Sequence, residues 1–387
     1  MRFPEFSGEW NKYTINDLAT VVGGGTPDTT VKSYWGGDIQ WFTPSEIGKN
    51  KYVDFSKRTI TRDGLDNSSA KLLPLHTILL SSRATVGECS IASNECTTNQ
   101  GFQSLIAKQC NIDFLYYLIQ TKKKDLIRNA CGSTFLEISA NEIRKIKVAV
   151  PVQNEQEQIA KLLSLIDERI ATQNKIIEDL KKLKSAISKY LFARKDLLET
   201  TICLSNIATL KNGYAFQSGK YNALGKWKIL TITNVPGERY INDEDCNCII
   251  NLPNDIQDHQ VLKEGDILIS LTGNVGRVSL CKNGNYLLNQ RVGLLQLAKN
   301  VNQEFLYQIL SSQRFENSMI ACGQGAAQMN IGKGDVENYV LPYSSNGNNI
   351  LFITKILHSY DECIINELRR LTLLTMQKQY LLTQMFI

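Results

Sequence analysis

The chain has 387 residues, of which 43% are hydrophobic and 21% are charged. This composition is typical of a globular protein and excludes a disordered or fibrous chain, and no run of about 18 apolar residues indicates a membrane-spanning helix. The net charge of +5 at pH 7 permits a polyanionic partner without requiring one, and the length predicts two or three domains.

The ten cysteines are scattered along the chain. No C-x-x-C pair occurs, and Cys246 and Cys248 are not followed by a histidine cluster, so the spacing does not indicate a zinc site. Free buried thiols in a reducing cytosol are the expected state. Residues 1–5 include no apolar stretch of the secretory type, so we expect a cytoplasmic protein without a signal peptide.

Residues 1–150 predict a mixed α+β domain. Short apolar runs at 39–43, 77–81 and 104–107 are bounded by turn residues and predict strands. A helix is expected over 112–130, where Phe114, Leu115 and Leu118 share one face. We interpret Gly23-Gly24-Gly25 as a tight turn, because no strand–turn–helix spacing of a dinucleotide site follows it.

A long helix is expected within the segment 151–195, and it begins just after Pro151. Acidic residues stand in its first turns and lysines come late, which is the order that the helix dipole favours. Side chains recur along it at spacings of four and three residues, the period of a helix that faces a partner helix. This seam consists of Ile159, Leu163, Ile166, Ile170, Gln173, Ile177, Leu180, Lys184, Ile187 and Leu191.

Residues 196–343 repeat the first domain. Ala130-Cys131-Gly132 returns as Ala321-Cys322-Gly323 and Phe114-Leu115-Tyr116 as Phe305-Leu306-Tyr307, each displaced by 191 positions (321 − 130 = 305 − 114). Strands are expected at 228–233, 266–271 and 293–297. The halves differ most at 23–75 and 211–262, which suggests one scaffold with two different ligand specificities.

The second long helix is expected over 344–387, and its seam repeats the first one at a displacement of 194. The matching positions are Ile353, Leu357, Tyr360, Ile364, Glu367, Leu371, Leu374, Lys378, Leu381 and Met385. Even the polar interruptions recur, Gln173 as Glu367 and Lys184 as Lys378. Each helix of about 40 residues spans ~60 Å. We interpret the pair as an antiparallel coiled-coil spacer; the alternative is two amphipathic helices, each packed on its own domain.

Catalytic motifs are mostly missing. The glycine-rich stretch at 325–333 lacks P-loop spacing. The amino-methyltransferase signature needs a Pro-Pro that does not occur, and Asp179-Leu180-Lys181 lies within a long helix rather than a nuclease sheet. His76, His259 and His358 are far apart. We therefore expect a chain that recognises a ligand while other subunits do the chemistry, without a metal site of its own.

Polar turns beside the predicted strands are the candidate reading residues. Arg and Lys can bond guanine, and Asn and Gln can bond adenine, in the DNA major groove; the alternative is that these groups brace turns. Lys49 and Lys51 stand in a basic and aromatic stretch that suits a phosphate-binding face or an ordinary half-buried surface. The recurring loops supply Arg83, Thr85, Asn99, Gln100, Thr272, Asn274, Arg277, Gln290 and Arg291.

This organisation resembles the DNA-specificity subunit of type I restriction–modification systems over essentially the whole chain. Each half has a core in which Leu79-Leu80-Ser81 or Leu268-Ile269-Ser270 is followed by Val-Gly and Asn-Gln. Each core leads to Val150-Pro151 or Leu341-Pro342 and a long helix. The helices carry Ile-Asp-Glu-Arg-Ile at 166–170 and Tyr-Asp-Glu-Cys-Ile at 360–364. The Gln/Glu-rich opening at 153–159 is similar to the family's, whereas the second copy at 345–353 has lost it.

The resemblance implies two target-recognition domains, 1–150 and 196–343, that each read one half of an asymmetric, split sequence in double-stranded DNA. The helices at 151–195 and 344–387 would hold the half-sites apart. It also implies a non-catalytic chain without cofactors. Its partners would be two modification subunits, which use S-adenosylmethionine to methylate adenine N6, and two restriction subunits, which use ATP and Mg to translocate and cut DNA.

Two rival functions remain open on the sequence. A two-headed, protein-binding scaffold with a coiled-coil spacer fits the repeat equally well, and salt-dependent duplex binding distinguishes it from a DNA reader. An enzyme with an unrecognised site is the other, and methyl transfer or DNA cleavage by the isolated chain would identify it.

Overall fold

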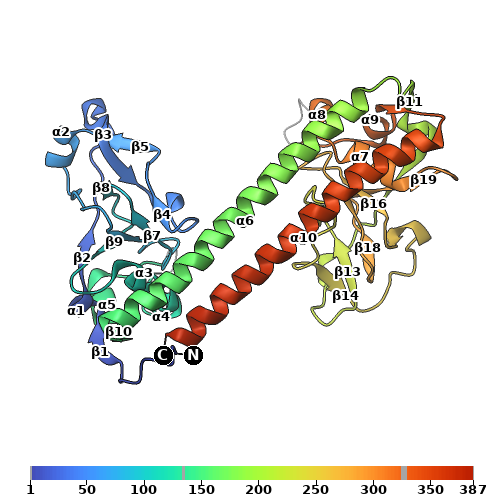
Figure 1. Cartoon of the computed structure of the whole chain (residues 1–387). Helices are drawn as coiled ribbons and strands as arrows, with labels where there is room; N and C mark the ends of the chain where they lie inside the picture. Colours follow the sequence, from blue (N-terminus) through green and yellow to red (C-terminus); the bar gives the residue numbers. More distant parts are fainter. Residues whose placement is uncertain (1, 133–135, 324–328, 387) are drawn as a thin grey trace. The chain divides into compact units, whose positions relative to one another are not determined.

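The computed structural model describes residues 2–132, 136–323 and 329–386 (Figure 1). The chain forms two compact units. Unit 1 comprises residues 1–174 and 370–387, and unit 2 comprises residues 175–369. Each unit therefore combines one globular domain with a part of both long helices, whereas the sequence suggested four consecutive segments. The glycine-rich stretch at 325–333 lies partly outside the described residues.

The globular part of unit 1 holds two sheets. Its core sheet has the order β2-β9-β6-β7-β4 and its outer sheet the order β5-β3-β8. A pair of strands at the domain's base, β1 (Asn11–Thr14) and β10 (Lys147–Val150), is antiparallel. The core strands are β2 (Ala19–Gly23), β9 (Gln103–Ala107), β6 (Ile78–Leu80), β7 (Cys89–Ala92) and β4 (Tyr52–Val53). The outer strands are β5 (Arg58–Ile60), β3 (Trp35–Phe42) and β8 (Cys96–Thr98).

The helices of this domain are short. They are α1 (Ile15–Leu18), α2 (Arg62–Asp66), α3 (Ile112–Thr121), α4 (Lys123–Arg128) and α5 (Ala140–Lys145). The single helix expected over 112–130 is thus two helices, because the chain leaves helical geometry at Lys122. The Asn111 side chain accepts a hydrogen bond from the Phe114 N–H at 3.0 Å and so caps α3.

Unit 2 repeats this plan. Its core sheet has the order β12-β19-β16-β17 and its outer sheet the order β14-β13-β18-β15, with the antiparallel pair β11 (Thr200–Cys203) and β20 (Val340–Tyr343) at the base. The core strands are β12 (Ala208–Asn212), β19 (Val292–Leu297), β16 (Ile267–Ser270) and β17 (Val278–Leu280). The outer strands are β14 (Asn247–Ile249), β13 (Trp227–Leu230), β18 (Tyr286–Leu288) and β15 (Val261–Leu262), and the short helices are α7 (Gln303–Leu310), α8 (Gln313–Cys322) and α9 (Lys333–Glu337).

The duplication extends into the segments whose sequences differ most. In unit 1, β3 is parallel to β8 and antiparallel to β5. In unit 2, β13 is parallel to β18 and antiparallel to β14. The outer sheets therefore share a topology that the sequences at 23–75 and 211–262 no longer reveal. Equivalent strands follow the same path even though their side chains have diverged.

The glycine run corrects one expectation. Gly24 and Gly25 do not have the positive φ of a left-handed turn. A Cβ atom on Gly24 would lie 2.1 Å from the Asn99 carbonyl oxygen, and one on Gly213 would lie 2.2 Å from that of Asn289. Glycine is required at both places because the backbone that leaves the core sheet passes directly over the Asn-Gln turn.

The two long helices are α6 (Gln153–Ala193) and α10 (Gly347–Met385). No seam residue of either helix is exposed, including Gln173, Lys184, Glu367 and Lys378. In unit 1, Ile159 and Leu163 of α6 share a core with Leu381 and Met385 of α10 and with the domain's helix α3. In unit 2, Leu191 of α6 shares a core with Ile353 and Leu357 of α10 and with α7. Among the described helices, none is both long and apolar enough to cross a membrane.

Ion pairs join the two helices in each unit. Asp167 lies 2.7 Å from Lys378 in unit 1, and Lys184 lies 2.5 Å from Asp361 in unit 2. The two aspartates and the two lysines are equivalent residues of the repeat (361 − 167 = 378 − 184 = 194). Because the shared cores pair early α6 residues with late α10 residues in unit 1, and the reverse in unit 2, the helices run antiparallel within each unit.

The two helices begin differently. Glu155 is fully buried, and both its oxygens accept hydrogen bonds of 2.7 Å from Arg2. At the equivalent position of α10, the Asn349 side chain donates to the Leu197 carbonyl at 3.1 Å. Glu199 accepts hydrogen bonds from the Ser345 N–H and hydroxyl, and hydrogen bonding to its carboxylate lowers the pKa of Glu199 to about 2. The second helix thus keeps a defined start although its Glu/Gln run is lost.

The shared core gives a stability prediction. Leu163 of α6 is fully buried, whereas Leu165 on the same turn is 50% exposed. We expect Leu163→Ala to lower the free energy of unfolding by about 2–5 kcal/mol, since it removes apolar contacts and leaves a cavity. Leu165→Ala is the matched control and should change it by less than about 1 kcal/mol. Denaturant titration of both variants checks this, and equal losses would contradict the seam.

Candidate nucleic-acid interface

In unit 1 the predicted loops meet at one end of the core sheet. The loop between β6 and β7 lies beside the turn between β8 and β9, because the Ser82 N–H donates to the Gly101 carbonyl at 2.8 Å. Arg83 and Thr85 are exposed in the first loop, and Gln100 is exposed in the second. Ala84 between them has a φ of 63°, a strained value for a residue with a side chain. The sequence motifs therefore converge on one surface.

Several of these side chains also brace the loops. The Arg83 guanidinium contacts the Glu137 carboxylate at 2.6 Å, and the Thr85 and Ser81 hydroxyls are 3.0 Å apart. The Asn99 side chain accepts from the Gly101 N–H at 2.9 Å. Gln100 accepts a hydrogen bond from the Thr26 hydroxyl at 2.5 Å, which ties the turn to the divergent segment. Arg83, Thr85 and Gln100 are exposed although they also brace the loops. Asn99 is only partly exposed, so the turn-bracing interpretation applies most fully to it.

Unit 2 builds the same surface from different residues. The Leu271 N–H donates to the Arg291 carbonyl at 3.0 Å, which places the β16–β17 loop beside the β18–β19 turn. Asn274, Gln290 and Arg291 are exposed. Thr272 is tied to Asn330 at 3.2 Å, and Arg277 lies 3.5 Å from Glu316.

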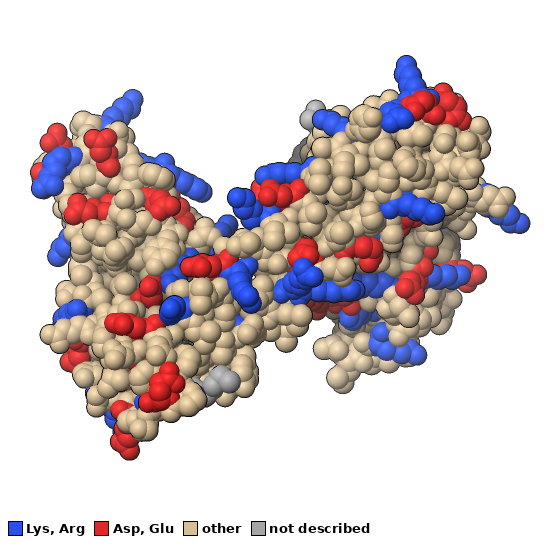
Figure 2. All heavy atoms as spheres, in the orientation of Figure 1, with Lys and Arg blue, Asp and Glu red and all other residues tan. Residues whose placement is uncertain are grey.

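The two lysines that sequence analysis grouped together have different environments. Lys49 is exposed, in the segment that leads to β4. Lys51 is only 9% exposed, and its ammonium lies 2.7 Å from Asp113 and 2.6 Å from the Ser164 hydroxyl. A lysine held in this way is not available to a phosphate, so of the two only Lys49 remains a candidate contact. Figure 2 shows Lys and Arg side chains interspersed with Asp and Glu across the visible face.

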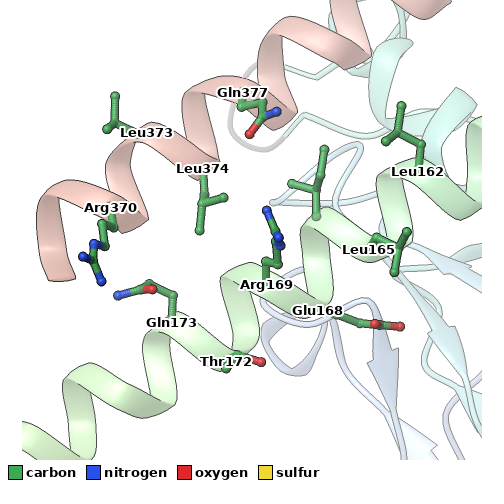
Figure 3. Close-up of a pocket in the computed structure, with 11 residues that line it drawn as sticks. Leu162, Leu165, Glu168, Arg169, Thr172, Gln173, Arg370, Leu373, Leu374 and Gln377 are labelled. Atoms are coloured by element: carbon green, nitrogen blue, oxygen red, sulfur yellow. The ribbon is translucent and has the colours of Figure 1, made fainter.

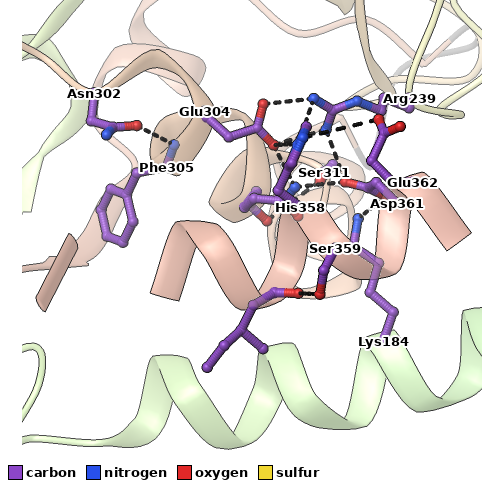
Figure 4. A network of polar contacts seen from close by, with 12 residues as sticks. Lys184, Arg239, Asn302, Glu304, Phe305, Ser311, His358, Ser359, Asp361 and Glu362 are labelled. Atoms are coloured by element: carbon purple, nitrogen blue, oxygen red, sulfur yellow. Dashed lines mark hydrogen bonds and ion pairs between the residues drawn. The ribbon is translucent and has the colours of Figure 1, made fainter. Parts of the chain in front are cut away.

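Sequence analysis missed a polar cluster in unit 2 (Figure 4). Arg239, 8% exposed at its side chain, lies 2.7 Å from Glu304 and 2.9 Å from Asp361. Burial alone would lower the pKa of Arg239, but its hydrogen bonds and the nearby charges of Glu304 and Asp361 together raise it. The repeated Asp-Glu pair of the long helices was a signal for Asp361. Nothing marked Arg239, because it belongs to the segment in which the halves differ.

A groove lies between the two long helices within unit 1 (Figure 3). Its volume is about 820 Å³, and its lining includes Leu162 and Leu165 of α6 and Leu373 and Leu374 of α10. Arg169 and Gln377 add polar groups to its walls. Leu165 and Leu373 are 50% and 65% exposed, so the helix pair presents apolar surface outside its buried seam.

The two halves of the chain both match one family model, the type I restriction modification DNA specificity domain, over residues 7–182 and 199–376. These matches cover most of the chain. The chain belongs to this family. Each match contains one globular domain and most of the long helix that follows it.

Curated relatives of this chain are named as specificity subunits of type I restriction enzymes. It is 38% identical over 192 residues to the specificity subunit of the type I restriction enzyme MjaIX from Methanocaldococcus jannaschii, which covers 48% of this chain and 44% of that one. It is 28% identical over 230 residues to the MjaVIII specificity subunit of the same organism, with 53% of each chain covered. The chain thus spans about half the length of the curated relatives it matches.

Solved structures share the fold of this chain. The crystal structure of a type I restriction–modification S subunit from M. genitalium superposes with a TM-score of 0.57 at 18% identity, covering 100% of this chain and 99% of that one. A second structure, described in terms of complex assembly and conformational transition of the type I system, gives 0.59 at 13% identity and covers 98% of both chains. At these identities the likeness concerns the fold alone.

The loop geometry gives a binding prediction. Arg83 is a candidate base-reading residue. Arg83→Ala should therefore weaken specific DNA binding by about 1–3 kcal/mol and relax the sequence preference at one base position. Lys49→Ala should instead weaken binding to all sequences and lower the salt slope by about one unit. Titrations against substituted duplexes at several salt concentrations check both, with the exposed Arg128→Ala as control. If Arg83→Ala binds every duplex like the parent, the loop is structural and the reading residues lie in 23–75.

Proposed function

We propose that this protein is the DNA-specificity subunit of a type I restriction–modification complex. Each globular domain would bind one half of a split, asymmetric target in double-stranded DNA. The observation that carries the proposal is the duplication itself. Two domains of one topology present equivalent loop pairs at the end of a core sheet, yet they differ in the residues those loops expose. Two similar but non-identical heads suit a target with two different halves.

The chain would act without catalysis of its own and without a bound cofactor. Its partners would be two modification subunits, which carry S-adenosylmethionine and methylate adenine, and two restriction subunits, which use ATP and Mg. This assignment follows the family, whose model is named for DNA specificity. The role places the protein in the cytoplasm with its DNA. A protein-binding scaffold is not favoured, because the relatives described above are named as specificity subunits.

The long helices would serve as the spacer between half-sites. The seam, the antiparallel direction within each unit and the equivalent Asp–Lys pairs all support a continuous two-helix rod. Polar residues within such a seam cost stability but fix the register of the two helices. A rod of fixed register would keep the two heads at a set distance, and a set distance would select targets by the number of base pairs between the half-sites.

The assignment of one domain to one half-site predicts that the domains are modular. Replacement of residues 1–150 by the corresponding domain of a relative should change one half of the recognised sequence and leave the other half intact, because each domain carries a complete copy of the core. Mapping of methylated adenines, in DNA from cells that carry this chain with its modification subunit, measures both halves at once. A change in both halves, or in neither, would refute the assignment of one domain to one half-site.

The spacer role of the long helices predicts an effect of helix length on the target. Removing one heptad from each helix, residues 170–176 together with 369–375, keeps the register set by the two ion pairs. The rod should then shorten by about 10 Å, so the methylated motif should lose roughly three base pairs between its half-sites. Substitution of the exposed Leu373 alone is the control for disturbing the helices. An unchanged spacer in the methylation map would show that the helices are not the ruler.

A further inference from the structure

The buried charges of unit 2 centre on Arg239. This residue lies in the long connection between β13 and β14 of the outer sheet, yet its side chain reaches α7 and α10 (Figure 4). Its two terminal nitrogens bond Glu304 of α7 at 2.8 and 2.7 Å, and one of them also bonds Asp361 of α10 at 2.9 Å. The Gln308 amide closes the cluster by donating to Glu304 at 2.7 Å and to Asp361 at 2.6 Å. The partly exposed His358 ring lies 3.1 Å from Arg239 at the edge of the cluster.

Unit 1 contains a counterpart centred on Lys51. This lysine lies in the connection between β3 and β5 of the outer sheet, and it bonds Asp113 of α3 and Ser164 of α6. Tyr117 lies beneath it, with the ring centroid 4.9 Å from the ammonium, and donates from its hydroxyl to Asp167 at 2.7 Å. Burial, and the bond that Tyr52 donates to Asp113, raise the pKa of Tyr52 to about 12 and keep its hydroxyl a donor.

The two clusters occupy equivalent positions of the repeat. Asp113 and Glu304 are displaced by the 191 positions of the domain repeat, and Ser164 and His358 by the 194 of the helix repeat. Backbone hydrogen bonds place the two cations at equivalent points of the fold. The Lys51 carbonyl accepts from the Ile91 N–H of β7 at 2.7 Å, and the Arg239 carbonyl accepts from the Leu280 N–H of β17 at 2.8 Å. Each cation is followed by a tyrosine, Tyr52 or Tyr240, that adds to the edge of the core sheet in parallel.

These contacts differ from ordinary surface ion pairs. The side chains of Lys51, Arg239 and Asp361 are 9%, 8% and 7% exposed. Solvent screens such a pair little, and removing one partner leaves a buried charge without compensation. Both cations come from segments in which the halves otherwise diverge, whereas their acidic partners lie on the helices that repeat. A charge pair is thus retained between the variable and the repeated part of each domain.

We propose that Lys51 and Arg239 are positioning residues that lock the variable outer sheet of each recognition domain onto the helices that carry it. An apolar contact would hold the segment in place but would allow it to slide. Arg239 bonds two acids on two helices, and Lys51 bonds an acid and a hydroxyl on two helices. Because these bonds are directional, they fix the rotation of the segment as well. The inference that this orientation serves DNA reading rests on the proposed function; the lock itself does not.

The lock is tested first without DNA, by hydrogen exchange of the full chain. Arg239→Met should accelerate exchange about tenfold or more at the Ile241 and Leu280 amides, which bond the Leu280 and Arg239 carbonyls, while α7 and β16 keep their protection. Arg239→Lys should retain most of the protection, because lysine fills this role in unit 1. Glu238→Gln is the matched control. Glu238 lies in the same connection as Arg239, and the substitution breaks its exposed ion pair with Lys181 of α6. Parent-like exchange in Arg239→Met, or acceleration across all of unit 2 in both Arg239 variants, would overturn the lock.

The second test uses the complex with its modification subunits and duplexes in which one half-site at a time is scrambled or the spacer is changed by one base pair. Arg239→Met should weaken binding through the half-site of residues 196–343 by about tenfold and relax the spacer preference, without affecting the other half-site. Lys51→Met should do the reverse. Equal losses at both half-sites would overturn the positioning role. If the parent complex itself shows no bipartite preference, the proposed function fails, and the exchange result still decides the lock.

Discussion

The fold depends on the stripe of side chains that each long helix buries along its length. A helix of about 40 residues with a polar outer face gains little stability from its own backbone bonds. Here α6 contributes Ile159, Leu163 and Ile166 to the core of unit 1 and Leu191 to the core of unit 2. The helix is thus part of both domains rather than a linker between them. This explains why the compact units cut through the helices and do not follow the boundaries at 150, 195 and 343.

Charge within that stripe adds specificity to the packing. Hydrophobic seams tolerate a shift by one heptad, because one apolar residue resembles the next. The pairs Asp167–Lys378 and Lys184–Asp361 do not tolerate it, since any shift would leave buried or half-buried charges apart. Asp361 illustrates the point, because it accepts from Lys184, Arg239 and Gln308 together. One carboxylate therefore contacts the other long helix and the variable segment at the same time.

Sequence reasoning recovered those features of the molecule that repeat with a fixed period. The seam positions and the strands at 77–81 and 266–271 follow from periodicity and turn chemistry acting locally, whereas the contact between the β6–β7 loop and the Asn-Gln turn is seen only in the structure. The break between α3 and α4 at Lys122 was not visible, because a local loss of helical geometry leaves the apolar pattern intact. The role of Lys51 was also missed. Its neighbours Tyr52 and Phe55 suggested a surface patch, and only the fold brings Asp113 and Ser164 to it from 62 and 113 positions away (113 − 51 and 164 − 51).

On the proposed function, one scaffold serves two different half-sites. A reading segment must then change its exposed residues, yet it must keep one orientation if the half-site is to meet the right base pairs. On that proposal Lys51 and Arg239 supply the fixed orientation, because each anchors an otherwise divergent segment through a side chain that is 9% or 8% exposed. The unlike cations, with displaced numbering (239 − 51 = 188 rather than 191), indicate that length and sequence have both changed around this contact. What the two halves have retained is the charge, its place on the edge of the core sheet and the acid that receives it. Recognition can therefore diverge residue by residue while the geometry of the reading head stays constant.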